Sequence, residues 1–315
     1  MLCTFSMVAA CHKTLRAIQF ATLPIVLPFF PLLYTDVTSL FFVLFAVFAA
    51  LRRMPLRSSI LITAAIGIRQ NNVLWVPLLP ALLLSQSAEW LKYAGSGGDP
   101  WHSFRKCLRN HSILRTLILS SIPFLLPLAL FCIYAIANGS PVLNRTPYHP
   151  FPAFFLGNAF LTLALVTLIF FPLALSKLRV IVSSLQSSSG RVPFFALIAI
   201  LFWMTFSASH PFNQHPDSLR GSLLLAVAGG GWPKVIFCLL LLFGLLTVVV
   251  TELTSSLFLL LYPLSIVFLS TVWLIDNRYA MIPLSLFLLF RKPLSWRMEV
   301  LQFAFNILLC LLVFS

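Results

Sequence analysis

Residues 113–137 read ILRTLILSSIPFLLPLALFCIYAIA, an apolar run whose one charged residue is Arg115. About 20 consecutive apolar residues cross the hydrocarbon core of a bilayer as a helix, so this stretch predicts a transmembrane helix. Comparable apolar runs use up most of the remaining chain. They lie at 1–11, 17–34, 37–51, 58–68, 73–86, 150–176, 192–208, 235–250, 255–275, 280–290 and 298–314. The runs 58–68 and 280–290 are short for a full crossing, and 58–68 with 73–86 is open to a second interpretation as a re-entrant hairpin.

The composition excludes the soluble classes of protein. The 315 residues are 60% hydrophobic and 9% charged, with a mean hydropathy of +1.00, whereas an average soluble domain is about 45–50% apolar and about 25% charged. Six cysteines form no C-x-x-C pair and lie mostly in apolar runs, which indicates neither a zinc site nor a disulfide framework. We therefore expect one all-α polytopic membrane domain over residues 1–315, with about 10–12 transmembrane or half-membrane helices.

The net charge of +14 predicts membrane orientation and not nucleic-acid binding, because the basic residues stand singly or in pairs between apolar runs. Counted over alternate loops, 16 of the 21 Lys and Arg residues fall on one side and five on the other. The positive-inside rule makes the first side cytosolic. The cytosolic side then includes a flexible basic loop at 87–112, and the lumenal side includes a loop at 209–234. The five lumenal basic residues are Arg69, Arg145, Arg220, Lys234 and Arg278.

Polar islands gather on the predicted lumenal side. They are Tyr34-Thr35-Asp36, Arg69-Gln70-Asn71-Asn72, the stretch 138–149, the stretch 210–234 and Ile275-Asp276-Asn277-Arg278-Tyr279. A charged residue at a membrane boundary is a functional hypothesis when it has a possible partner. We expect a site on this face of the membrane.

Two islands carry most of the predicted chemistry. The amides and guanidinium of Arg69-Gln70-Asn71-Asn72 suit sugar hydroxyls and phosphate, although the same residues also fit an ordinary short loop between spans. Arg278 is suited to bidentate phosphate binding. The alternative for Asp276-Asn277-Arg278-Tyr279 is a local ion pair that caps a helix, with Tyr279 at the membrane interface.

The remaining islands predict no cofactor. His210, His215 and Asp217 match no helical metal-ligand spacing, and Pro211 and Pro216 interrupt any helix there. We therefore expect no metal, and take His210, Asp217 and Arg220 as residues of a lumenal loop. Gly229-Gly230-Gly231 lacks the Gly-Lys-Ser/Thr of a phosphate loop and predicts a hinge before the next span. Asn138-Gly139-Ser140 and Asn144-Arg145-Thr146 match the N-glycosylation pattern.

Several of these segments together resemble one family. Arg69 to Trp75 (RQNNVLW) is similar to its R-Q-T-N-I-x-W signature, and Leu32 to Ser39 (LLYTDVTS) to its Y-T-[DE]-x-x-S stretch. Further matches are Leu15-Arg16 after Cys11, Asn138-Gly139 followed by Asn144 to His149, His210-Pro211-Phe212, and Asp276 to Tyr279 before Ile282-Pro283. The sequence thus resembles the dolichyl-phosphate-glucose-dependent α-1,2-glucosyltransferases of the endoplasmic reticulum.

The resemblance implies a fold, a reaction and a set of residues. The fold is that of the GT-C glycosyltransferases, in a multi-pass protein of the endoplasmic reticulum membrane. Glucose would pass from dolichyl phosphate glucose to the diglucosylated lipid-linked oligosaccharide of protein N-glycosylation, with membrane lipid and neither nucleic acid nor cofactor as partners. The implied substrate-binding residues are Arg69, Gln70, Asn71, Asn72, Trp75, Asp276, Arg278 and Tyr279. Arg69 and Arg278 would contact phosphate, and we expect the Arg69 turn and the Arg278 segment to lie on one membrane face, within reach of one lipid phosphate.

The catalytic residue is the point at which the sequence departs from the family. The family's acidic lumenal loop would precede residue 1, so Asp36 is the candidate for a substitute base. We expect little glucosyl transfer by this chain alone, and more from a version extended with that loop. The alternatives are a catalytically inactive truncated relative and a membrane transport protein, although no repeated halves favour a transporter.

Overall fold

The computed structural model describes residues 14–30, 34–87, 90, 109–141, 154–186, 191–215 and 219–314. Within these ranges the regular structure is helical, with no strand. The chain divides into two compact units. We call residues 33–152 and 253–271 the Arg69 unit, and residues 1–32, 153–252 and 272–315 the Arg278 unit. The prediction of an all-α membrane protein is confirmed.

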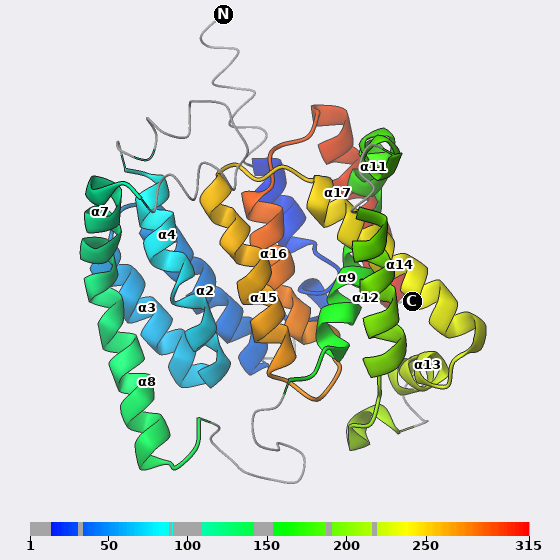
Figure 1. The fold of residues 1–315 in the computed structure, drawn as a ribbon, viewed down its shortest axis with the longest axis horizontal. Coiled ribbons are helices and arrows are strands. Elements are labelled where there is room, and N and C mark those ends of the chain that lie inside the picture. The colour runs from blue at the N-terminus through cyan, green and yellow to red at the C-terminus, as the bar shows by residue number, and fades with distance from the viewer. Residues whose placement is uncertain are drawn as a thin grey trace, which may run out of the picture. The chain divides into compact units, whose positions relative to one another are not determined.

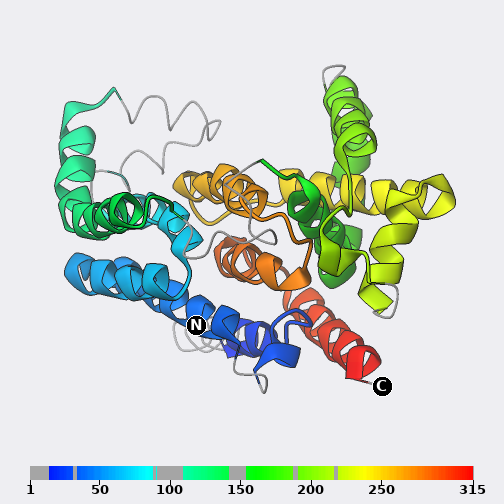
Figure 2. The same cartoon turned by 90° about the horizontal axis from the view of Figure 1, so that it is seen from below.

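The Arg69 unit is built on a hairpin of two helices, to which further α-helices and three 3₁₀-helices are added in the described residues. Its elements are α2 (Thr35–Leu51), α3 (Pro55–Ile68), η2 (Gln70–Trp75), α4 (Leu78–Ser85), α7 (His111–Ser121), η3 (Ile122–Phe124), α8 (Leu125–Ala137), η5 (Ser256–Leu260) and α15 (Leu261–Ser270). Helices α2 and α3 pack side by side (Figures 1 and 2). The turn between them has a positive φ of 57° at Arg53. Ser58 Oγ donates to the Ala46 carbonyl at 2.8 Å and joins the two helices near this turn.

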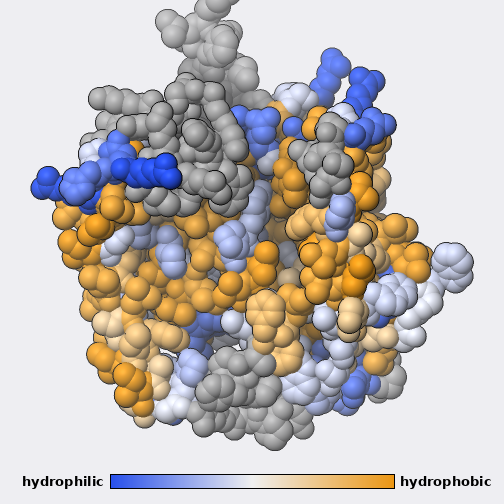
Figure 3. Space-filling view, in the orientation of Figure 1, coloured by the Kyte–Doolittle hydropathy of each residue, from blue (hydrophilic) through white to orange (hydrophobic). Residues whose placement is uncertain are grey.

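The continuous stretch α7–η3–α8 bears directly on the membrane prediction. Residues His111–Ala137 are long and apolar enough to cross a bilayer, yet only 11% of the span-length window is buried inside the protein. A core helix of a soluble protein would be mostly buried. Here large apolar side chains such as Leu125 and Ile133 are exposed, and hydrophobic surface covers the flank of these helices (Figure 3). Lipid is the solvent that suits such a surface.

The Arg278 unit contains the second span-length helix. Its elements are η1 (Leu27–Phe29), α9 (Gly157–Ile169), α10 (Phe171–Ser176), α11 (Leu178–Gln186), α12 (Arg191–Thr205), η4 (Pro211–Asn213), α13 (Leu219–Ala228), α14 (Gly231–Val250), η6 (Asn277–Ala280), α16 (Met281–Phe290) and α17 (Trp296–Phe314). Helix α14 meets the length and hydropathy requirements of a span. A Cβ on Gly244 would lie 1.9 Å from the Leu163 carbonyl oxygen of α9. The missing side chain therefore allows α9 and α14 to pack backbone to backbone, as small residues do between membrane helices.

Several helices coincide with the apolar runs and others differ. The run 150–176 contains two helices, α9 and α10, which meet at Phe170 just before Pro172. The segment 209–234, expected to be a loop, contains the ten-residue helix α13. Gly230 and Gly231 have positive φ values of 91° and 68° in the turn from α13 into α14, and the hinge predicted at this turn stays a prediction. Most of the basic loop predicted at 87–112 lies outside the described residues.

Candidate functional site

The first polar island forms a turn at the end of α3. The helix ends at Ile68, and Arg69 adopts an extended conformation with φ −142° and ψ 114°. The 3₁₀-helix η2 then begins at Gln70. Residues three apart on a 3₁₀-helix share a face, so Asn72 and Trp75 lie on one side of η2. Gln70 and Asn71, which the sequence analysis also named, are half-buried.

This turn is joined to the first turn of α2. The Arg69 guanidinium forms an ion pair with Asp36, whose side chain is 3% exposed while that of Arg69 is 20% exposed. Asn72 Nδ2 donates to Ser39 Oγ and to the Ala65 carbonyl, both at 2.7 Å. The stretches LLYTDVTS and RQNNVLW, which the sequence analysis considered separately, therefore meet. We call Asp36, Ser39, Arg69, Asn72 and Trp75 the Arg69 site.

Asn72 and Trp75 each have one buried polar atom that lacks a hydrogen-bond partner. These atoms are Asn72 Oδ1, an acceptor, and Trp75 Nε1, a donor. Both residues are at most 1% exposed, and the Trp75 ring lies against Phe268 with 5.2 Å between ring centroids. A buried polar atom usually has a partner. Both atoms are thus unsatisfied within the packed interior, one as an acceptor and one as a donor.

The second island lies in the Arg278 unit. Asp276 is the N-cap of η6, and its Oδ1 accepts from the Arg278 backbone amide at 3.2 Å. Asp276 Oδ2 lies 3.2 Å from Arg278 Nε, and the guanidinium lies over the ring of Tyr279, 5.3 Å from the ring centroid. This geometry is the local capping ion pair that the sequence analysis named as the alternative. The Arg278 side chain is 21% exposed, so the same residue still has surface for a ligand.

Two asparagines that the sequence analysis missed hold this island in place. Asn158 Nδ2 donates to the carbonyls of Val272 and Leu274, and its Oδ1 accepts from the Asp276 amide. Asn213 makes a reciprocal pair with the backbone of Ile275, at 2.9 and 3.0 Å. Both asparagines are at most 1% exposed. Asn158 interrupts the apolar run 150–176, and a lone amide in such a run is the signal by which sequence reasoning could have found it.

The loop residues named with His210 are only partly brought to this island. His210 is 1% exposed, its Nδ1 accepts from the Phe212 amide at 3.1 Å, and its ring meets that of Trp273 edge-on. We call Asn158, His210, Asn213, Asp276, Arg278 and Tyr279 the Arg278 site. Asp217 lies outside the described residues, and Arg220 is the second residue of α13, with a side chain that is not described. In the described ranges no group of three or more His, Cys, Asp or Glu could hold a metal ion.

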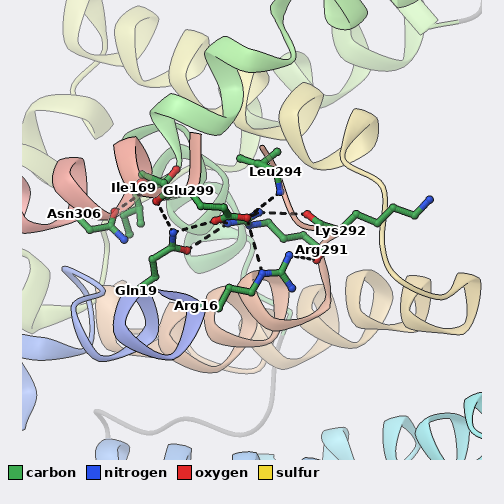
Figure 4. A network of polar contacts seen from close by, with 9 residues as sticks. Arg16, Gln19, Ile169, Arg291, Lys292, Leu294, Glu299 and Asn306 are labelled. Atoms are coloured by element: carbon green, nitrogen blue, oxygen red, sulfur yellow. Dashed lines mark hydrogen bonds and ion pairs between the residues drawn. The ribbon is translucent and has the colours of Figure 1, made fainter. Parts of the chain in front are cut away.

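A third polar cluster is structural. Arg291 and Glu299 are joined by two hydrogen bonds of 2.8 and 2.6 Å, and Gln19 Nε2 donates to Glu299 Oε2 at 2.9 Å (Figure 4). Arg16, the residue of the Leu15-Arg16 motif, donates to the Arg291 carbonyl at 2.8 Å. Arg291, Glu299 and Gln19 are fully buried. The cluster thus fastens residues 14–21 to the start of α17, and assigns Arg16 a packing role.

Exposed apolar helices that carry two buried aspartate–arginine pairs define an all-α membrane protein with polar sites at helix ends. A sequence profile of the DIE2/ALG10 family matches residues 3–215. The chain belongs to this family, the family of dolichyl-phosphate-glucose α-1,2-glucosyltransferases of the endoplasmic reticulum. No curated protein and no solved structure matches the chain.

The match confirms the resemblance inferred from the motifs. It supports a glucosyltransferase that acts in the synthesis of the lipid-linked precursor of N-glycans. The matched residues include the whole of the described Arg69 turn, but they end before Asp276. The role of Arg278 therefore depends on its own residues and geometry, and the prediction that both arginines serve one phosphate stays a prediction.

Proposed function

We propose that the protein transfers glucose from dolichyl phosphate glucose to the diglucosylated lipid-linked oligosaccharide, in α-1,2 linkage, at the lumenal face of the endoplasmic reticulum membrane. A GT-C architecture is part of this proposal. The observation that carries it is the turn at the Arg69 site, in which a family motif presents a partly exposed guanidinium next to the half-buried amides of Gln70 and Asn71. A lipid phosphate and a sugar are the ligands that such groups bind.

The chemistry assigns distinct work to the residues. Transfer with inversion breaks the bond between glucose and phosphate, so negative charge develops on the departing dolichyl phosphate. Arg69 and Arg278 are proposed to stabilise that charge, as preorganised cations do for phosphoryl and related leaving groups. The half-buried Gln70 and Asn71 are proposed to bind sugar hydroxyls, while the fully buried Asn72 and Trp75 are proposed to hold the turn that presents them. The exposed apolar helices are suited to the dolichyl chains of both substrates.

Complementation tests the proposal. The chain is expressed alone, and preceded by the first span and acidic lumenal loop of a family member, in cells that accumulate the diglucosylated lipid-linked oligosaccharide. At least one form is expected to convert this species to the triglucosylated one, as measured on released, labelled oligosaccharides. Failure of both forms, when each is present in the membrane at normal amounts, would overturn the proposal.

A matched pair of variants shows whether the Arg69 site carries the conversion. Arg69→Gln and Arg57→Gln are the same chemical change at opposite ends of α3. Arg57 is exposed, and the described contact of its guanidinium is with Met54 Sδ in the same turn. Conversion should be lost in the first variant and kept in the second. Equal loss in both would show that the assay reports general damage to α3.

A further inference from the structure

The Arg69 site contains two pairs of side chains with matching spacing. Asp36 and Ser39 are three residues apart on the first turn of α2, and Arg69 and Asn72 are three residues apart across the start of η2. Residues three apart on a helix share a face. The pairs therefore meet in register, with Asp36 against Arg69 and Ser39 against Asn72.

The contacts leave Asp36 poorly placed to act on a substrate directly. A general base must come within hydrogen-bond reach of the proton that it takes. The Asp36 side chain is 3% exposed, and its carboxylate forms an ion pair with the Arg69 guanidinium. Arg69 has the larger exposed fraction, 20%. Of the two charged groups, the guanidinium is the one that presents surface to a ligand.

The contact between Asn72 and Ser39 fixes the turn that carries Arg69. Arg69 follows the last residue of α3 in an extended conformation, so the helix itself does not fix the direction of its side chain. Asn72 Nδ2 binds the Ala65 carbonyl near the end of α3 and Ser39 Oγ of α2 at the same time. This amide thus fixes the path of the turn, while Asp36 fixes the guanidinium.

We propose that Asp36 and Ser39 are positioning residues, which hold Arg69 and Asn72 in the orientation in which Arg69 contacts the phosphate of the lipid-linked sugar donor. This inference depends on the proposed function, and it assigns Asp36 a different role from that of the substitute base. A guanidinium has five N–H donors, so it can bind a carboxylate along one edge and a phosphate along another. A preoriented arginine loses less freedom when the donor binds.

A double-mutant cycle separates a positioning role from a base. The variants are Asp36→Asn, Arg69→Gln and the two together, made in the form of the chain that restores conversion. Each is assayed for glucose transfer over a range of dolichyl phosphate glucose concentrations. If Asp36 acts through Arg69, Asp36→Asn should raise KM about tenfold, and the double variant should be no worse than Arg69→Gln within about twofold. If Asp36 is a base, adding Asp36→Asn to Arg69→Gln should lower kcat by a further factor of about 10²–10⁴.

Controls keep the test independent of folding. Asp36→Glu keeps the carboxylate and should recover part of the KM. Ser39→Ala should raise KM less than Asp36→Asn, whereas Ser58→Ala removes a buried hydroxyl between the same helices near their other end and should leave KM unchanged. The double variant removes both charges and leaves no buried charge unpaired, so its thermal unfolding should remain cooperative.

The outcomes distinguish this inference from the proposed function. Dolichyl phosphate binding to the purified protein gives a readout besides turnover, and it should weaken in Asp36→Asn and Arg69→Gln alike. Normal transfer by the wild type with additive effects of the two substitutions would overturn the positioning role and leave the function intact. Absence of both transfer and dolichyl phosphate binding in the wild type would overturn both.

Discussion

The Arg69 site and the Arg278 site reach similar chemistry by different routes. Each places an arginine, about one-fifth exposed, beside an aspartate that is at most 5% exposed. At the Arg69 site the aspartate comes from another helix, 33 residues earlier in the chain. At the Arg278 site the aspartate is two residues away and also caps η6, while Asn158 and Asn213 supply the distant contacts. The orientation of Arg69 thus depends on charge, whereas the position of Arg278 depends on amide hydrogen bonds.

The largest effect is expected from removing either guanidinium. Arg69→Gln and Arg278→Gln should each lower the rate of glucose transfer by a factor of about 10²–10³, the typical cost of removing one group that stabilises developing charge. Arg→Lys at either position keeps the charge but not the two-pronged geometry, and should recover only part of the rate. Transfer assays in membranes measure this. A normal rate in Arg278→Gln would exclude the Arg278 site from the reaction, and would contradict the claim that the two sites have similar chemistry.

Next in size is the loss of the amide that anchors the Arg278 site. Asn158→Ala removes partners from two carbonyls and one amide, and an unsatisfied buried group costs about 1–3 kcal/mol. The free energy of unfolding of the protein in detergent should fall by about that amount, as followed by thermal or denaturant unfolding. Thr162→Val is the matched control one turn further along α9, because Thr162 Oγ1 bonds only within its own helix, to the Asn158 carbonyl. Equal loss in both variants would remove the special role of Asn158.

A smaller effect is expected for Asp276→Asn, which sharpens the contrast with Asp36→Asn. Asparagine is as good an N-cap as aspartate, so η6 should keep its start. The lost ion pair is local and its arginine is partly exposed, which corresponds to at most about 1 kcal/mol, or about a fivefold rise in KM for the donor. Steady-state kinetics of Asp276→Asn and Asp36→Asn, measured under the same conditions, compare the two rises in KM. A larger loss in Asp276→Asn than in Asp36→Asn would contradict the inferred division between charge and amide support.

The smallest effect is expected for an exposed ion pair, which serves as a reference for the two aspartate–arginine pairs. Glu252 and Lys292 form an ion pair of 2.6 Å with side chains 66% and 57% exposed. The hydrogen bond and charge of Lys292 lower the pKa of Glu252 below its ordinary value of 4.5. Its small stabilisation is therefore present above pH 4.5 and is lost as the pH falls through the lowered folded-state pKa. Glu252→Gln should change the free energy of unfolding at pH 7 by less than about 1 kcal/mol, and added salt should shrink even this difference.

The sequence by itself determined the membrane environment, the fold class and the family of this protein. Apolar runs of span length require lipid or a helical interior whatever their neighbours are, because an unpaired backbone group in hydrocarbon is too costly. The motif around Arg69 likewise depends on residue types and spacing, and it was enough to indicate the family that the profile match shows. The local capping pair of Asp276 and Arg278 was also open to sequence reasoning, because its partners lie within one turn.

Only the tertiary structure decided which residues support which. Nothing in the order of residues joins Asp36 to Arg69, or Asn158 to the backbone at Asp276, because these contacts join segments 33 and 118 residues apart. The same holds for Arg16, which the sequence analysis named as part of a family motif and which the fold fastens to the start of α17. The physical reason is that a buried charge or amide must find a partner wherever packing brings one. The spacing of residues along one helix shows which face they share, and only the packed helices show what that face meets.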